Sequence, residues 1–242
     1  QKMKTELITN VSHDLKTPLT SIITYIDLLK DENLDANKRK DYIATLDHNS
    51  LRLKNLIDDL FEISKINSGN VMLNIVDVDI IALVQQAKFE LNDYFEKKHL
   101  IFKTNYPNKK IILPLDSLKT YRIFENLLIN ISRYTLDNTR VYIDIIDYSD
   151  CVEIIFKNIS ANEIKISEDR LVERFVQGDI SRNNKGSGLG LAIAKSFTEL
   201  QNGIFKIKVD GDLFKAIVIF KKYTIIISIL FYQKHLRVSK FS

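Results

Sequence analysis

His13 stands beside a carboxylate in the run Ser12–Thr20, whose apolar spacing indicates an amphipathic helix. A neutral imidazole is a competent nucleophile near pH 7, and Asp14 can accept the proton on its other ring nitrogen. Thr17 lies four residues on, on nearly the same helix face, and Pro18 predicts a bend just beyond the histidine. Such a group can accept a phosphoryl group, although an isolated exposed histidine on a helix is usually only solvated.

A glycine loop in the second half of the chain could hold the phosphates that such a histidine would need. Gly186, Gly188 and Gly190 let the backbone approach a phosphate closely, and a helix expected from Leu189 to Leu200 adds its positive N-terminal end. A G-x-G-x-G run alone is weak support, because such loops also serve as plain turns.

Three polar side chains fall on one face of a helix expected from Leu118 to Tyr134. They are Asn126, Asn130 and Arg133. Amide oxygens suit a hard cation such as Mg²⁺, and an arginine can neutralise phosphate oxygens. Taken alone, the same pattern describes an ordinary polar helix surface.

The elements that carry the histidine are predicted to be two antiparallel helices. Apolar residues repeat at four-three spacing from about Lys4 to Lys30 and again up to Lys65, with a short break between. The two seams consist of Leu15, Leu19, Ile22, Ile26 and Leu29, and of Tyr42, Leu46, Asn49, Leu53, Leu56, Leu60 and Ile63. Ile43, Ile57 and Ile66 widen the second stripe, which favours a homodimeric four-helix bundle over packing against another part of this chain.

Beyond Gly69 the pattern becomes α+β. Strands are expected at 71–76, 100–105, 110–115, 140–148, 152–158, 204–209 and 213–221. One helix is expected to be capped by Asp77 or Asp79 and to end at Tyr94, and another at 118–134 to be capped by Asp116 or Ser117. One short helix is expected within 158–185. We therefore predict a helical-hairpin domain at 1–68, an α+β domain at 69–222 and a tail at 223–242 without a functional interpretation.

Composition narrows the class of protein. The 242 residues are 45% hydrophobic and 27% charged, as in soluble globular proteins, and the net charge of +4 forms no basic stripe that would predict nucleic-acid binding. The single Cys151 excludes an internal disulfide, and no Cys/His cluster has zinc spacing. The longest apolar run, Tyr223 to Tyr232, is half a bilayer span, so a cytoplasmic chain is expected.

The run from Thr5 to Ser21, TELITNVSHDLKTPLTS, resembles the H box of sensor histidine kinases of bacterial two-component systems. The resemblance extends from about Lys4 to Phe220. It implies that His13 is phosphorylated, that Asp14 is the assisting base, and that Thr17 orients water for dephosphorylating the response regulator.

Two more segments resemble parts of the same family's ATP-binding fold. FENLLINISRYT, at 124–135, resembles the N box, which implies magnesium at Asn130, a phosphate contact from Arg133, Tyr134 against the nucleotide and a lesser role for Asn126. The loop of Gly186, Gly188 and Gly190 with the LAIAKS that follows it resembles the G2 box. By the same resemblance, residues 176–185 form a lid and Phe175 is the F-box aromatic.

The chain departs from the family pattern at two positions. Asn158 stands where an aspartate usually accepts the adenine amino group, in the run IFKNISAN. Gln177 stands where an arginine commonly reaches the γ-phosphate, and Arg174 or Arg182 could compensate. An asparagine supplies an acceptor oxygen but also carries donors.

The resemblance implies an α/β-sandwich ATPase domain of the histidine kinase, gyrase and Hsp90 type behind a dimeric four-helix bundle. ATP with Mg²⁺ would phosphorylate His13, and the phosphoryl group would pass to an aspartate of a response regulator, with regulator phosphatase activity as a further possibility. The alternative is a degenerate kinase acting as a nucleotide-binding or dimeric scaffold. Membrane attachment, expected for parent proteins of this kind, would come from a region outside this chain.

Overall fold

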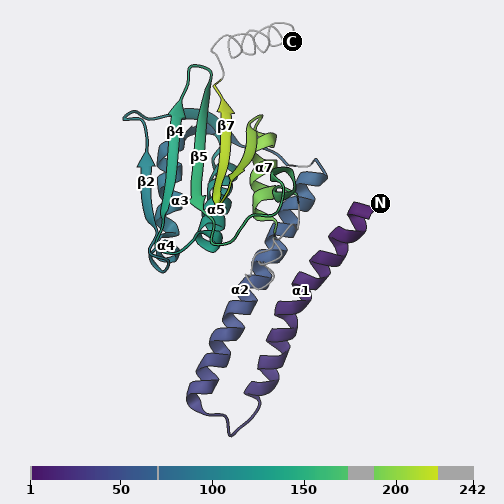
Figure 1. The fold of residues 1–242 in the computed structure, drawn as a ribbon. Helices are drawn as coiled ribbons and strands as arrows, with labels where there is room; N and C mark the ends of the chain where they lie inside the picture. The colour runs from purple at the N-terminus through teal and green to yellow at the C-terminus, as the bar shows by residue number, and fades with distance from the viewer. Residues whose placement is uncertain (1, 70, 174–187, 223–242) are drawn as a thin grey trace. The chain divides into compact units, whose positions relative to one another are not determined.

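A computed structural model describes residues 2–69, 71–173 and 188–222, apart from the side chains of residues 2–11, 13 and 67 (Figure 1). Internal contacts divide the chain into two compact units, one of residues 1–72 and 173–193 and the other of residues 73–172 and 194–242. We call the two helices of the first the hairpin and residues 73–172 with 194–222 the sheet unit. The domain boundaries given above remain a prediction.

The hairpin consists of α1, Lys2–Leu29, and α2, Ala36–Asn67, which confirms the two predicted helices. The Asp35 carboxylate caps the start of α2 by accepting from the backbone N–H groups of residues 37 and 38. The Tyr25 and Tyr42 rings meet edge to face at 5.1 Å, and Asn49 Nδ2 donates to Ser21 Oγ at 3.1 Å. The earlier residue of α1, Ser21, pairs with the later residue of α2, Asn49, so the two helices run antiparallel.

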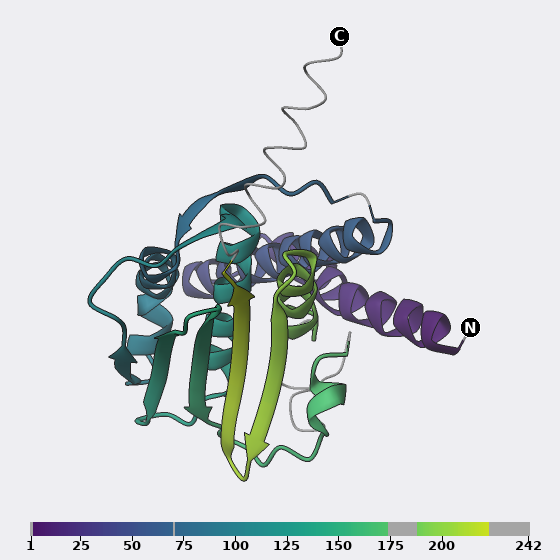
Figure 2. The ribbon, with the colours of Figure 1, turned by 90° about the horizontal axis from the view of Figure 1, so that it is seen from above.

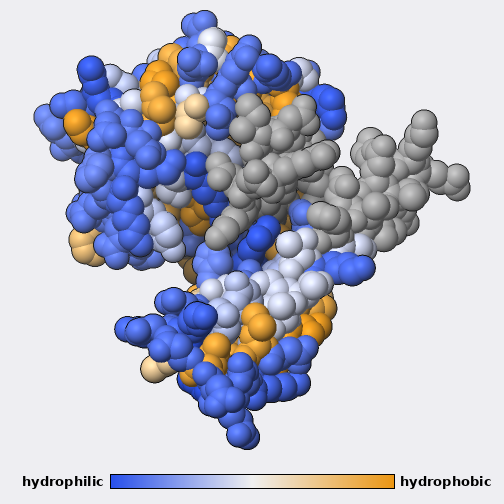
Figure 3. Space-filling view, turned by 60° about the horizontal axis from the view of Figure 1, so that its bottom comes forward, coloured by the Kyte–Doolittle hydropathy of each residue, from blue (hydrophilic) through white to orange (hydrophobic). Residues whose placement is uncertain are grey.

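Much of the apolar surface of the hairpin is uncovered. Leu56 and Ile63 of α2 are buried, whereas Ile43 and Ile57, which widened the predicted stripe, are 54% and 37% exposed. The exposed apolar side chains of the hairpin are Leu19, Ile23, Ile26, Leu28, Ile43, Leu51, Ile57 and Phe61. Figure 3 shows orange apolar side chains at the surface of the hairpin. Exposed apolar side chains in this number are typical of a surface that contacts a partner.

The sheet unit is built on a five-stranded sheet of order β2-β4-β5-β7-β6. The strands are β2 Ile101–Asn105, β4 Arg140–Asp147, β5 Cys151–Ile159, β6 Ile204–Asp210 and β7 Leu213–Lys221. β2 runs parallel to β4 and the other pairs are antiparallel. A separate antiparallel pair joins β1, Ile75–Asp79, to β3, Ile112–Asp116.

Helices cover one face of the five-stranded sheet (Figure 2). The helices of this part of the chain are α3 Ile80–Glu90, α4 Asn92–Glu96, α5 Ser117–Tyr134, α6 Glu168–Leu171 and α7 Gly190–Leu200. Burial alternates along β5, as expected for side chains that point to opposite faces of a sheet, and Val152, Ile154 and Phe156 are buried. The Phe124 ring of α5 lies 6.0 Å from the Phe156 ring, which places α5 over the middle of β5.

The structure corrects two of the predicted elements. The first strand lies at 75–79 and not at 71–76, because its register is set by pairing with β3 and it ends where the Asp79 carboxylate caps α3. The helix expected to continue to Tyr94 breaks at Leu91. After the break, Phe95 is buried with its ring 4.7 Å from that of Phe102.

The helices in the described part of the chain include none with the length and hydrophobicity of a membrane-spanning segment.

A buried polar network fixes the start of α5. The Asp116 carboxylate caps the helix by accepting from the backbone N–H of Lys119 and also accepts from the backbone N–H of Asn74. The backbone N–H of Asp116 and the hydroxyl of Thr120 donate to Gln201 Oε1, at 2.8 and 3.2 Å. These bonds tie the start of α5, the chain leading into β1 and the end of α7 together.

Candidate active site

The C-terminal half of α5 brings the polar residues of its predicted face to one side. Asn126 is buried, and one N–H of its Nδ2 donates to the carbonyl of Arg122 at 2.8 Å. Asn130, one turn on, is half-buried, and Arg133 is exposed. The two outer residues are therefore accessible to a ligand in a way that the first is not.

The end of α5 is held by a lysine that the sequence did not single out. Lys98 Nζ donates to the carbonyls of Arg133 and Thr135, at 3.2 and 2.9 Å, and lies 3.4 Å from the Asp137 carboxylate. A cation on the last carbonyls of a helix stabilises that end. A lysine in a loop 35 residues earlier gives no local signal of this contact.

Tyr134, the last residue of α5, is half-buried. Burial raises the pKa of its phenol, and the nearby charge of Arg133 opposes that rise only in part. The phenol therefore stays protonated at neutral pH and keeps its hydrogen-bond donor.

The end of β5 lies against the end of α5. Leu136 N donates to the Ile159 carbonyl at 2.9 Å, Ala161 N donates to the Tyr134 carbonyl at 2.8 Å, and Thr135 forms an isolated β-bridge with Ser160. These contacts join the chain that follows Asn158 to the end of α5.

Asn158 belongs to the helix-covered face of the sheet. It is 2% exposed and alternates with Phe156 and Ile154, whereas Lys157 belongs to the opposite face. Its Oδ1 has no hydrogen-bond partner among the described residues, and the same is true of the hydroxyl of Thr135, which is completely buried. A buried acceptor without a partner costs roughly 1–3 kcal/mol, so a ligand that supplies a donor here would recover that cost.

Lys157, the residue before Asn158, has its charge on the opposite face of the sheet. Its Nζ lies 2.5 Å from an Asp144 oxygen and 5.7 Å from the centre of the Tyr142 ring, both on the same outer face of the sheet. Its positive charge is therefore neutralised away from the α5 residues.

The glycine loop is described only at its end. Gly188 has φ 65°, a left-handed conformation that favours glycine, Leu189 is buried, and Gly190 is the first residue of α7. Gly186, Phe175, Gln177, Arg174, Arg182 and the predicted lid at 176–185 lie outside the described residues, as does the tail.

The segment that carries His13 lies in an unbroken helix. α1 runs without interruption through His13 and across Pro18, while the side chain of His13 itself is not described. Asp14 is half-buried and Thr17 is exposed. The four-residue spacing keeps His13 and Thr17 on neighbouring turns of the same face.

Metal binding at this site would depend on amide oxygens. No group of three or more His, Cys, Asp or Glu side chains that could hold a metal ion occurs in the described part of the chain. The half-buried Asn130 amide fits Mg²⁺ only if phosphate oxygens and water complete the octahedral shell, which is how Mg²⁺ is usually held.

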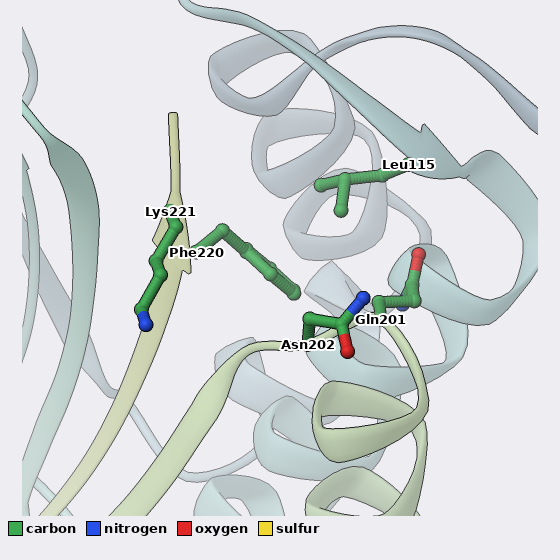
Figure 4. A pocket seen from close by; sticks show the side chains of 5 residues that line it. All are labelled: Leu115, Gln201, Asn202, Phe220 and Lys221. Carbon is green, nitrogen blue, oxygen red and sulfur yellow. The ribbon is translucent and has the colours of Figure 1, made fainter. Parts of the chain in front are cut away.

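A pocket of the sheet unit lies elsewhere (Figure 4). It is lined by Leu115, Gln201, Asn202, Phe220 and Lys221 and has a volume of about 150 Å³. Leu115 precedes α5 and Asn130 is near its end, so the two are separated by roughly 20 Å along the helix. The pocket is also below the roughly 300–1,000 Å³ of typical ligand sites, and we do not assign it to a nucleotide.

Comparison with known families matches both parts of the chain. Residues 3–69 match the His Kinase A (phospho-acceptor) domain, and residues 115–225 match the histidine kinase-, DNA gyrase B- and HSP90-like ATPase family. The chain belongs to the sensor histidine kinases. This agrees with the resemblance stated above and with the fold, a helical hairpin followed by an α/β-sandwich.

Individual relatives give the same result. Sensor protein VanSC of Enterococcus gallinarum is 32% identical over 206 residues, which are 84% of this chain and 56% of that protein. The chain thus spans about half the length of this curated relative. Histidine kinase AdeS of Acinetobacter baumannii has a TM-score of 0.73 at 17% identity, covering 88% of this chain and 98% of that one. Histidine kinase ThkA, solved with response regulator protein TrrA, has a TM-score of 0.71 at 18% identity, covering 90% and 61%.

Proposed function

We propose that the chain phosphorylates itself on His13 with ATP and passes the phosphoryl group to an aspartate of a response regulator. The observation that carries this proposal is the meeting of two elements in the sheet unit. The end of α5, the helix that carries Asn130 and Arg133, is hydrogen-bonded to the end of β5, where a buried Asn158 oxygen has no partner among the described residues. The match to an ATPase family over residues 115–225 supports ATP as the donor.

Each polar group then has a task that its chemistry allows. The Asn130 amide would hold Mg²⁺, which neutralises phosphate charge when bound, and Arg133 would contact a phosphate oxygen. Tyr134 and Asn158 would lie against the base. Gly186, Gly188 and Gly190 would receive phosphate oxygens on their backbone N–H groups, together with the N-terminal end of α7.

Phosphoryl transfer needs little further covalent chemistry from the protein. A neutral ring nitrogen of His13 would donate its lone pair to the γ-phosphorus, and the bond from that phosphorus to the bridging oxygen would break with release of ADP. Asp14 would accept the N–H of the other ring nitrogen and stabilise the positive charge that develops on the imidazole. The phosphohistidine would then lose the group to a regulator carboxylate.

A homodimer follows from the uncovered apolar residues of the hairpin. Leu19 and Ile26 of α1 and Ile43 and Ile57 of α2 are exposed, and a second copy would bury them in a four-helix bundle. A response regulator would dock on the hairpin beside His13, where it could receive the phosphoryl group. Histidine kinase ThkA, a protein of this fold, has been solved in complex with response regulator protein TrrA. Membrane attachment of a longer parent protein remains an expectation from the family.

The direct test is labelling by ATP with Mg²⁺. The native chain should take up an acid-labile, alkali-stable phosphate, and His13→Gln should take up none. His48→Gln is a matched control, since His48 is another histidine of the hairpin and is exposed on α2. Equal labelling of native chain and His13→Gln would reject the proposal. Failure of the native chain to bind ATP would favour the alternative of a degenerate scaffold.

Thr17 supports a second activity, removal of phosphate from the regulator. It is exposed one turn from His13, where its hydroxyl could orient a water molecule. Thr17→Ala should abolish regulator dephosphorylation while labelling of His13 survives. Retention of dephosphorylation in this variant would remove Thr17 from the mechanism.

A further inference from the structure

Two buried oxygens at the junction of α5 and β5 have no hydrogen-bond partner among the described residues. They are Oδ1 of Asn158, in a residue 2% exposed, and Oγ1 of Thr135, in a residue with no exposed surface. Thr135 forms a β-bridge with Ser160, which follows Asn158 by two residues, so the two unpartnered oxygens belong to adjacent segments of the chain. Two such atoms on adjacent segments indicate a site for a ligand that carries hydrogen-bonding groups.

The residues next to Asn158 do not fix the orientation of its side-chain amide. Its partners across the sheet are Val141 on β4 and Phe214 on β7, both apolar and buried. The one charged group next to it in sequence, Lys157, is paired with Asp144 on the other face. No carboxylate or ammonium among these neighbours fixes the direction of a hydrogen bond at Asn158.

The chemistry of the amide differs from that of the aspartate usual in this family. A carboxylate only accepts, so it fits the 6-amino group of adenine and repels the 6-oxo group of guanine or hypoxanthine. An amide presents one acceptor and one donor side by side. It can accept from the adenine 6-amino group while donating to N1, or turn over to donate to a 6-oxo group while accepting from N1–H. The Thr135 hydroxyl can likewise donate or accept.

We propose that Asn158 makes the nucleotide site accept 6-oxopurine nucleotides, the guanosine and inosine phosphates, alongside those of adenosine. This inference rests on the proposed function, because it assigns the base of the nucleotide to the Asn158 end of the site. Asn158 is then a specificity-determining residue, and the departure from the family pattern widens the choice of phosphoryl donor.

The test compares the binding of ADP, GDP and IDP to the whole chain by calorimetry in the presence of Mg²⁺. At least one 6-oxopurine nucleotide should bind within about ten-fold of ADP, because the amide can satisfy either base. IDP lacks the 2-amino group of guanine and so separates hydrogen bonding from steric fit. Asn158→Asp should shift the ratio of affinities toward ADP by at least about ten-fold, because a carboxylate has no donor for a 6-oxo group and leaves that buried acceptor unpaired.

Asn138→Asp is the matched control, because it makes the same chemical change at an exposed turn residue before β4. It should leave the ratio unchanged. Binding of ADP alone, with both 6-oxopurine nucleotides weaker by more than ten-fold, would overturn the inference and leave the proposed function intact. An unchanged ratio in Asn158→Asp would also overturn it. Absence of binding by all three nucleotides would overturn both the inference and the proposed function.

Discussion

The sheet unit and the hairpin differ in how far each encloses its own apolar side chains. In the sheet unit Phe124, Phe156, Phe197 and Phe220 are almost completely buried, whereas in the hairpin Phe61 is 64% exposed. The sheet unit therefore has a core of its own. The hairpin leaves apolar side chains open to a further surface. Under the proposed function, nucleotide binding belongs to the sheet unit and assembly to the hairpin.

Removing a core ring should give the largest loss of stability. Phe156→Ala should lower the free energy of unfolding by about 3–5 kcal/mol, because the ring is buried against Phe124. Phe89→Ala, at a residue 79% exposed on α3, is the control and should change it by less than about 0.5 kcal/mol. Urea unfolding measures both. Equal losses would show that the sheet unit is not packed as described.

A pair of substitutions should separate the tasks of the two parts. Asn130→Ala should weaken Mg²⁺-dependent ATP binding and lower the rate of autophosphorylation by about 10²–10³-fold, the usual cost of one transition-state contact. His13→Gln should abolish labelling yet bind ATP normally. Calorimetry and labelling together check this. Normal ATP binding by Asn130→Ala, or lost binding by His13→Gln, would contradict the division of tasks.

Carboxylates introduced at exposed apolar residues of α1 should dissociate the proposed homodimer. Leu19→Glu combined with Ile26→Glu places two carboxylates at positions 47% and 46% exposed on one face of α1. The dissociation constant of the dimer should rise by about 100-fold, since burying unpaired charge costs several kcal/mol. Phe89→Glu is the control at an exposed apolar residue of the sheet unit. Sedimentation velocity showing an intact dimer in the double variant would exclude this face from the interface.

Acid should remove a smaller contribution to the stability of the fold, which comes from the ionised Asp147 carboxylate at the end of β4. The Asp147 carboxylate accepts from Lys109 Nζ at 2.7 Å and from Lys222 Nζ, and these bonds lower its pKa, Lys109 contributing most. The folded pKa lies below the unfolded one, so the stabilisation is present above the unfolded pKa of about 3.9 and is lost as pH falls through the folded value.

Asp147→Asn should therefore lower the melting temperature at pH 7 and have less effect near pH 3. Because Lys109 is largely exposed, solvent screening limits the difference to about 1 kcal/mol or less. Thermal melts at the two pH values measure it. An equal effect at both pH values would show that the change acts through packing and not through charge.

Local patterns predicted the elements well where they carried their own signal. The four-three repeats predicted α1 and α2, and alternation predicted β4, β5 and β7 to within a residue or two. β1 was placed four residues early, because the alternation near Val71 resembles a strand and only pairing with β3 decides where the strand lies. The break at Leu91 is followed by the buried Phe95. No pattern in the neighbouring residues predicts that burial.

The sequence predicted which residues belong to the candidate site, but not the contacts that these residues make. The α5 face and Asn158 followed from motifs, but the side of the sheet on which Asn158 lies comes from the register with Val141 and Phe214. The unpartnered Thr135 hydroxyl and the Lys98 cap come from residues distant in sequence. The roles of His13 and Gly186 remain predictions.

Mapping the phosphate after incubation with ATP and Mg²⁺ tests the central claim most directly. Peptide mass spectrometry at alkaline pH should find one phosphorylated peptide, the one that contains His13, and far less of it in Asn130→Ala after the same incubation time. Phosphate on any other residue, or on the His13 peptide in a chain that cannot bind ATP, would contradict a transfer from the sheet unit to the hairpin.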